Sequence, residues 1–314
     1  MPYELGHRLV VGVASSALFD LRESDALFRS RGEAAYREYQ EQHLDDPLEP
    51  GVAFPFIRRL LSLNDLGEPA DPLVEVIVLS RNDPDTGLRV MRSVEHHELQ
   101  ISRAVFMRGK SPYKFMPALG MSLFLSSDRA SVLQAAALGL PAGRVLDSTA
   151  ADDMDDPDLR IAFDFDGVLG DDSSEQIFQS GDLKEFHAHE REQAHVPQEP
   201  GPLKDFLAKI NVIQTKEEER KLADPDYRIR LHVSIVTARN APAHERAIRS
   251  LKSWGVNVND AFFLGGIAKA PIIEALQPHI FFDDQLLHLE STAEAAPSVH
   301  KPFGALNQPG VAAG

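Results

Sequence analysis

Four groups of polar residues in this 314-residue chain have the types and spacing that phosphoryl transfer needs. Asp164 and Asp166 come directly after an apolar run, and Asp283–Asp284 follow another. Thr237 ends a third run, and Lys269 lies at the start of an expected helix. Transfer through an aspartyl phosphate needs a carboxylate nucleophile, a second carboxylate as acid and base, and hydroxyl and ammonium groups to bind phosphoryl oxygens.

The residue types assign a role to each position. We expect Asp164 to attack phosphorus, and Asp166 to protonate the leaving oxygen and then deprotonate the attacking water. Thr237 and Lys269 would bind the phosphoryl oxygens, and a lysine placed against a helix dipole indicates an anion nearby. Carboxylates gathered in one crevice repel one another, so Mg²⁺ is the expected cofactor. Its candidate ligands are Asp164, Asp166, Asp283 and Asp284.

These polar residues follow runs that read as buried strands. Ile161–Phe163, Val233–Val236 and Ile280–Phe282 are apolar without alternation, as in a parallel sheet that is covered on both faces. Helical patterns separate the runs, at Pro202–Ile213, Pro242–Trp254 and Pro271–Leu276. Because ligands bind outside the carboxyl ends of such strands, the polar residues should converge on one crevice.

The chain also repeats itself, which indicates two copies of one unit of about 150 residues. A shift of 150 places Leu9–Ser16 on Leu159–Asp166. A shift of 157 places Val76–Ser80 on Val233–Thr237 and Leu123–Ser127 on Ile280–Asp284. We expect the seven-residue difference to be a longer loop around 214–228.

The first copy lacks nearly every charged residue of the second at the strand ends. The corresponding residues are Ala14, Ser16, Ser80, Pro112, Ser126 and Ser127. The predicted fold is therefore α/β, with two tandem Rossmann-like parallel-sheet domains. Residues 1–150 form a degenerate non-catalytic copy, and residues 151–290 form the catalytic domain with a small helical cap at about 171–230. Residues 291–314, rich in Ala, Pro and Gly, are expected to be a flexible tail.

Four segments of the second copy resemble the motifs of the haloacid dehalogenase superfamily of phosphatases. They are DFDGV at 164–168, IVTAR at 235–239, Lys269 and FFDD at 281–284. Further segments resemble the cytosolic 5′-nucleotidase type I family, namely ALFD at 17–20, PGVAFPF at 50–56, RSLKSWGV at 249–256 and PHIFFDDQ at 278–285. The resemblance implies Mg²⁺-dependent hydrolysis of nucleoside 5′-monophosphates, with AMP a typical substrate.

The resemblance also implies the same residue roles, with Asp166 binding the metal through its carbonyl group. Phe165 and Gly167 depart from the pattern of animal members, so we expect any consequence to concern nucleotide preference and not catalysis. Candidate contacts to the base are Phe178, Phe186 and His187 in the expected cap. Two alternatives remain: a phosphatase for a sugar phosphate or another small phosphomonoester, and a nucleotide-binding sensor or scaffold without turnover.

Two polar clusters of the expected cap have a simpler interpretation. His187, His189 and His195 could form a transition-metal site, but residues two apart on a helix do not share a face. We therefore favour a solvated helix. Asp171, Asp172 and Glu175 are interpreted as a solvated turn and helix start, with Ser173 or Ser174 as the cap.

The composition of the chain limits which binding partners and which cellular compartment are expected. The formal net charge of -16 disfavours a nucleic-acid polymer but allows a small nucleotide substrate. No apolar run is long enough for a membrane span, and the absence of cysteine suits the cytoplasm. Residues 7–17 mimic a secretory signal, but they include the first strand of the first copy. The resemblance is also compatible with a homo-oligomer.

Overall fold

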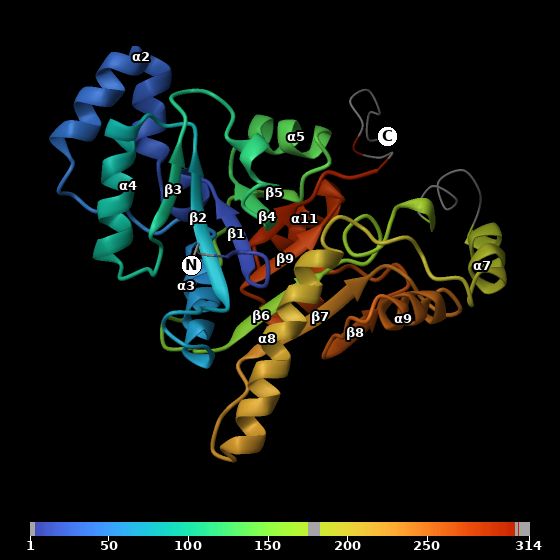
Figure 1. Cartoon of the computed structure of the whole chain (residues 1–314). Helices are drawn as coiled ribbons and strands as arrows, with labels where there is room; N and C mark the ends of the chain where they lie inside the picture. The colour runs from blue at the N-terminus through green and yellow to red at the C-terminus, as the bar shows by residue number, and fades with distance from the viewer. Residues whose placement is uncertain (1–3, 175–182, 305–306, 308–314) are drawn as a thin grey trace. The chain divides into compact units, whose positions relative to one another are not determined.

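The chain divides into two compact units, Met1–Val145 and Leu146–Gly314, in a computed structural model (Figure 1). The structure describes residues 4–174, 183–304 and 307, and for 183–187 it describes the backbone alone. None of the described helices is both long and apolar enough to cross a membrane.

The first unit is a parallel sheet with the strand order β3-β2-β1-β4-β5. Its strands are β1 (Leu9–Val13), β2 (Val74–Ser80), β3 (Arg103–Phe106), β4 (Met121–Ser126) and β5 (Ala142–Val145). Its α-helices are α1 (Ser15–Leu18), α2 (Arg22–Gln42), α3 (Phe54–Ser62), α4 (Pro84–His96) and α5 (Arg129–Ala137), with 3₁₀ turns η1 (Leu63–Leu66) and η2 (Tyr113–Phe115).

The second unit has the same kind of sheet, with the strand order β10-β9-β6-β7-β8. Its strands are β6 (Leu159–Phe163), β7 (Leu231–Thr237), β8 (Asp260–Phe263), β9 (Ile280–Asp283) and β10 (Ser298–His300). Its helices are α7 (Leu183–Glu192), α8 (Lys204–Ala223), α9 (His244–Ser253), α10 (Ala270–Leu276) and α11 (Leu286–Thr292).

Apolar side chains bury both faces of the second sheet. On one face Phe163 of β6 stacks on Phe282 of β9 at 5.2 Å between ring centroids, and Phe206 of α8 packs against both rings. The opposite face is buried by a cluster that includes Ala162, Val236, Phe281, Ile273 and Leu289. This arrangement confirms the prediction of a parallel sheet with helices, because strands buried on both faces show no alternation.

The strand pairings of the two units have the same register. Leu9 pairs with Val74 in the first unit, and Leu159 pairs with Leu231 in the second. These partners differ by 150 and 157 residues, the two shifts found in the sequence. The pairing of β1 with β4 corresponds in the same way to the pairing of β6 with β9. The pairing of β2 with β3 likewise corresponds to that of β7 with β8.

Helix α8 differs from the expectation in that region. The polar segment from 214 onward, expected to be a loop, continues the helix to Ala223. Lys, Glu, Arg, Leu and Ala have high helix propensity, so a helix forms here although an apolar stripe is missing. The Glu217 side chain is fully buried and accepts hydrogen bonds from the backbone N–H groups of Arg230 and Leu231 and from the Tyr227 hydroxyl.

The predicted flexible tail from residue 291 is wrong for the residues that the structure describes there. Strand β10 pairs in parallel with β9, with Ser298 opposite Phe281, and the Val299 side chain is fully buried. A three-residue strand with one apolar side chain leaves almost no pattern in the sequence. Its pairing with β9, which local sequence does not encode, determines its structure.

The expected cap at 171–230 is also too long. Phe206 and Leu207 of α8 are fully buried, and Phe206 packs on the sheet, so α8 belongs to the layer that covers the strands. An isolated bridge between Gly170 and Pro200 brings the two ends of residues 171–199 together. We refer to 171–199 as the insertion.

Candidate active site

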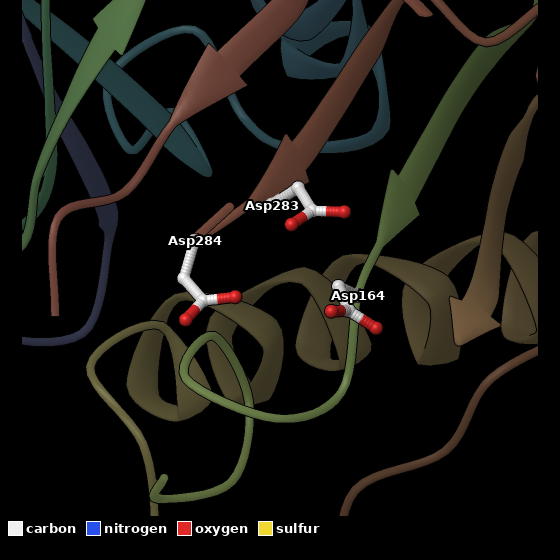
Figure 2. Close-up of side chains that lie close together, drawn as sticks. All are labelled: Asp164, Asp283 and Asp284. Carbon is white, nitrogen blue, oxygen red and sulfur yellow. The ribbon is translucent and has the colours of Figure 1, made fainter. Parts of the chain in front are cut away.

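Three carboxylates meet at the carboxyl ends of two neighbouring strands of the second unit. Asp164 follows β6, Asp283 ends β9, and Asp284 is the next residue. Each offers a ligand oxygen, and these oxygens lie within 4.8 Å of one another (Figure 2). The three residues are 4%, 0% and 3% exposed. The sequence prediction that these strand ends converge is therefore met for this trio, which we call the acidic cluster.

Lys269 lies within the acidic cluster. It precedes α10, is 4% exposed, and its Nζ lies 3.0 Å from Asp164 Oδ2 and 2.6 Å from Asp283 Oδ2. Burial lowers the pKa of this ammonium, but the two carboxylates outweigh burial and raise it above its usual value. The anions that offset the helix dipole are thus two aspartates of the protein, and a bound phosphate would be a further one.

The three carboxyl groups differ in acidity. Burial, opposed by Lys269, raises the pKa of Asp164 to about 6. Burial and the neighbouring Asp283 charge raise the pKa of Asp284 well above its usual value. Burial also acts on Asp283, but the Lys269 ammonium and the His288 ring outweigh it and keep the pKa of Asp283 low. Asp283 is therefore the most readily ionised of the three.

The acidic cluster fits a hard divalent cation. Its three carboxylates face one ammonium, so a formal excess of two negative charges is left among these four side chains. Asp284 Oδ1 is buried and has no hydrogen-bond partner among the described residues. A buried carboxylate oxygen without a partner is costly unless a cation binds it, and Mg²⁺ prefers such ligands.

Gly167 permits the close approach of Asp284 to the loop after β6. Its φ of +69° lies in the left-handed region, where other residues are strained. A Cβ atom at this position would come within 2.5 Å of Asp284 Oδ2. The Asp-Gly step after the first strand therefore has a steric reason in this structure.

The Asp166 carboxylate points to another group of residues. Its two oxygens each accept a hydrogen bond from Arg239, both at 2.7 Å, and Gln198 donates to Oδ1 at 3.2 Å. The side chain is 15% exposed. Asp166 is thus not one of the three carboxylates of the acidic cluster, and its predicted metal contact through the carbonyl group stays a prediction.

Thr237 ends β7, the strand beside β6, and is 1% exposed. Its Oγ1 accepts a hydrogen bond from the Arg239 backbone N–H at 3.3 Å. This position at the carboxyl end of the sheet suits the predicted phosphate contact, which stays a prediction.

Sequence reasoning missed several residues beside the acidic cluster. His288 Nδ1 lies 3.3 Å from Asp283 Oδ2. The backbone oxygen of Asp284 lies 3.0 Å from His300 Nε2 and accepts a hydrogen bond from Asn307. Burial lowers the pKa of the Lys301 ammonium to about 8. No local pattern marks His300, Lys301 and Asn307, because long-range packing brings 298–304 and 307 to the end of β9.

The other predicted contacts have mixed outcomes. Phe178 lies outside the described residues, as do the side chains of Phe186 and His187, so the base contacts stay predictions. Among the described residues the acidic cluster is the one group of three or more ligand side chains close enough for a metal ion. The solvated interpretation of His187, His189 and His195 stays a prediction. Of the two candidate helix caps, the Ser173 hydroxyl donates to Asp171 and the Ser174 hydroxyl donates to Glu190.

The first unit carries small residues at the corresponding strand ends. Ala14 follows β1, and Ser126 ends β4. Ser80 ends β2, and its hydroxyl lies 3.1 Å from that of Ser15. No group of metal-ligating side chains occurs in the described part of this unit.

Comparisons with known proteins identify the family of the chain. The chain matches the family described as 5′-nucleotidase over residues 1–308. It is 31% identical over 290 residues to human cytosolic 5′-nucleotidase 1B. That alignment covers 90% of this chain and 47% of the relative, so the chain spans about half the length of the curated relative. No solved structure matches the chain. With a match along nearly its whole length, the chain belongs to the 5′-nucleotidase family.

Proposed function

We propose that this protein hydrolyses nucleoside 5′-monophosphates, with AMP a typical substrate, to a nucleoside and phosphate. The observation that carries the proposal is the acidic cluster with Lys269 at the carboxyl ends of β6 and β9, in a chain of this family. The human relative is named a cytosolic 5′-nucleotidase, and we propose a cytoplasmic location here as well.

Asp164 is the proposed nucleophile. One of its oxygens attacks phosphorus, the bond from phosphorus to the 5′ oxygen breaks, and an aspartyl phosphate forms. With its pKa at about 6, Asp164 is ionised at neutral pH, as a nucleophile must be. Its Oδ1 accepts a hydrogen bond from the Phe165 backbone N–H at 2.8 Å, which fixes the plane of the carboxylate.

Asp166 is the proposed acid and base. It gives a proton to the departing 5′ oxygen and later takes one from the water that attacks the aspartyl phosphate. Lys269 has three N–H donors, and its contacts to Asp164 and Asp283 account for two. We propose that the third binds a phosphoryl oxygen, together with the Thr237 hydroxyl.

Asp164, Asp283 and Asp284 are the proposed Mg²⁺ ligands, joined by the Asp166 carbonyl group. Bound Mg²⁺ supplies positive charge that stabilises the phosphoryl group in the transition state. Lys269, the one ammonium in contact with the cluster carboxylates in the described chain, carries too little charge to balance them and a phosphate together.

We further propose that the two units are copies of one ancestral domain and that the first is non-catalytic. The shared strand order and register support this, together with small residues where the second unit carries its acids. The insertion, which lies between the first two strands of the second unit, is the proposed cap. A homo-oligomer stays a prediction.

A substrate panel tests the proposed function. Phosphate release from AMP, other nucleoside monophosphates and small sugar phosphates is measured with Mg²⁺ and with EDTA. We expect the highest kcat/KM for a nucleoside monophosphate, only with Mg²⁺, and no turnover for Asp164→Asn. A sugar phosphate as the best substrate would support the alternative phosphatase, and tight AMP binding without turnover would support the sensor. Acid-quenched wild-type protein should carry phosphate on Asp164.

A further inference from the structure

A buried network of charged residues joins the loop after β6 to the insertion. At its centre is Arg239, two residues beyond the end of β7 and 4% exposed. Arg239 Nε donates to Asp166 Oδ2 and Nη2 donates to Oδ1, both at 2.7 Å. This two-point pairing fixes both the position and the plane of the Asp166 carboxylate.

Arg239 has no donor left for a substrate. A guanidinium carries five N–H groups. Besides the two that go to Asp166, Nη2 donates to Gln198 Oε1 at 2.7 Å, and Nη1 donates to Glu190 Oε2 at 2.5 Å and to the Ala243 backbone oxygen at 3.1 Å. Every donor has an acceptor within the protein. A phosphate-binding role would break one of these bonds, so the geometry favours a role in holding Asp166.

Glu190, in α7 of the insertion, holds Arg239 from the other side. Its side chain is fully buried. While Oε2 accepts from Arg239, Oε1 accepts from Arg246 Nη1 at 2.9 Å and from the Ser174 hydroxyl at 2.8 Å. Two arginines thus balance two carboxylates, and a buried carboxylate with this many partners is stable in place. The insertion is therefore connected to the Asp166 carboxylate in two ways, through Arg239 and through the direct hydrogen bond from Gln198.

The first unit has a counterpart for part of this network. Arg89 corresponds to Arg246, and Gln40 corresponds to Glu190, in the alignment of the two units. Arg89 Nη1 donates to Gln40 Oε1 at 3.2 Å, as Arg246 donates to Glu190. This contact occurs in a unit without the acids, so it belongs to the structure of the fold.

The contact between Arg239 and Asp166 has no such counterpart. Asn82 stands at the position of Arg239 and Ser16 at that of Asp166. The guanidinium and the carboxylate are therefore absent together from the unit that lacks the acidic cluster. Their joint absence ties Arg239 to the chemistry of the second unit.

We propose that Arg239 is the positioning residue of Asp166, held in turn by Glu190 of the insertion. This inference rests on the proposed function. For this step the Asp166 carboxylate first takes a proton from water on one oxygen, while the other oxygen keeps its hydrogen bond from Arg239. When Asp164 attacks phosphorus and the bond to the 5′ oxygen breaks, the 5′ oxygen receives this proton as its electron pair leaves. Without Arg239 the Asp166 carboxyl group loses the contact that fixes its position and its plane, so this proton transfer should slow.

Two substrates with different leaving groups distinguish a role of Arg239 in positioning Asp166 from a general structural role of Arg239. The test uses AMP and its analogue in which sulfur replaces the bridging 5′ oxygen, so that the base and the sugar are unchanged. A thiol is a far stronger acid than an alcohol and leaves without a proton. The ratio kcat/KM reports the steps up to leaving-group departure and is independent of later hydrolysis of the aspartyl phosphate.

For Arg239→Lys we expect kcat/KM for AMP to fall by about 100-fold, and kcat/KM for the sulfur analogue by less than about fivefold. Gln198→Ala and Glu190→Gln should show the same selectivity with smaller losses. If circular dichroism shows that Arg239→Lys does not fold, these two variants test the inference in its place. Arg89→Lys in the first unit is the matched control, expected to leave the ratio between the two substrates unchanged.

Equal losses on both substrates would overturn the inference and leave the proposed function intact. Selectivity for Arg239→Lys without any for Glu190→Gln would overturn the part assigned to the insertion. Wild-type protein that released phosphate from no nucleoside monophosphate would instead contradict the proposed function, and the inference with it.

Discussion

The buried carboxyl group of Asp164 predicts that its removal stabilises the metal-free protein. Its pKa is about 6, against 3.8 for the ordinary group, so the folded state favours the neutral form. One pKa unit corresponds to 1.36 kcal/mol, and Asp164→Asn should therefore raise the free energy of unfolding by about 3 kcal/mol at pH 7.5. Asparagine keeps the shape and removes the charge, and at 4% exposure little screening by solvent reduces the effect.

The sign of the pH dependence follows from the same shift. A carboxyl group with a raised folded-state pKa lowers stability progressively as pH rises from about 4 through 6, because only the unfolded state ionises easily there. The gain from Asp164→Asn should thus be about 0.5 kcal/mol at pH 4 and reach its full value above pH 7. Urea unfolding in EDTA at both pH values measures it.

A matched control is Asp226→Asn, at an exposed aspartate, which should change stability little at either pH. If Asp164→Asn were no more stable than wild type at pH 7.5, the cost assigned to burying this carboxylate would be wrong. A gain of the same size at pH 4 would also refute the reasoning, since it could not come from ionisation.

Three further perturbations test the acidic cluster and its surroundings. Millimolar Mg²⁺ should raise the melting temperature of the wild-type protein at pH 7.5, and Asp284→Asn should remove most of that rise. Thermal melts with Mg²⁺ and with EDTA measure it. An equal rise for the wild-type protein and for Asp284→Asn would mean that the ion binds elsewhere. Lys269→Gln leaves Asp164 and Asp283 without their shared cation, so phosphate release should cease and metal-free stability in urea should fall by about 3–5 kcal/mol. Glu217→Ala removes the acceptor of two backbone N–H groups and a tyrosine hydroxyl and should cost about 3 kcal/mol in urea unfolding, with nucleotide kcat/KM unchanged in the folded protein.

The convergence of the acidic cluster was predictable because it needs only two rules. Apolar runs without alternation indicate parallel strands buried on both faces, and the carboxyl ends of parallel strands meet at one edge of the sheet. Asp164 and Asp283 lie 119 positions apart in the sequence, yet each stands at the carboxyl end of its own strand. Their proximity therefore required no knowledge of side-chain packing.

The direction of a side chain was not predictable in the same way. Asp166 comes three residues after β6, beyond the regular strand, so no periodicity fixes where its carboxylate points. Arg239, Gln198 and Glu190 determine it, and these residues come from the loop after β7 and from the insertion. The sequence places Arg239 of the segment IVTAR near a strand end, but it does not indicate that Arg239 pairs with Asp166.

A polar helix and a short strand were missed for a related reason. The second half of α8 has no apolar stripe, and its one buried acid, Glu217, is satisfied by groups that precede β7 or begin it. Strand β10 exposes almost no pattern and depends on β9 for its hydrogen bonds. Both elements depend on contacts distant in sequence, whereas pattern reasoning uses neighbours.

The first unit serves as an internal reference for what the acids contribute. Strands β1, β2 and β4 keep the register of β6, β7 and β9 with Ala14 and Ser126 at the ends in place of Asp164 and Asp283. The sheet therefore forms without carboxylates, and in the second unit the buried Asp164 lowers metal-free stability at neutral pH. The fold does not need the Asp164 carboxylate, and this carboxylate lowers stability. We therefore infer that a bound ligand compensates for the lost stability. A divalent cation with a phosphate is the ligand that these residues fit.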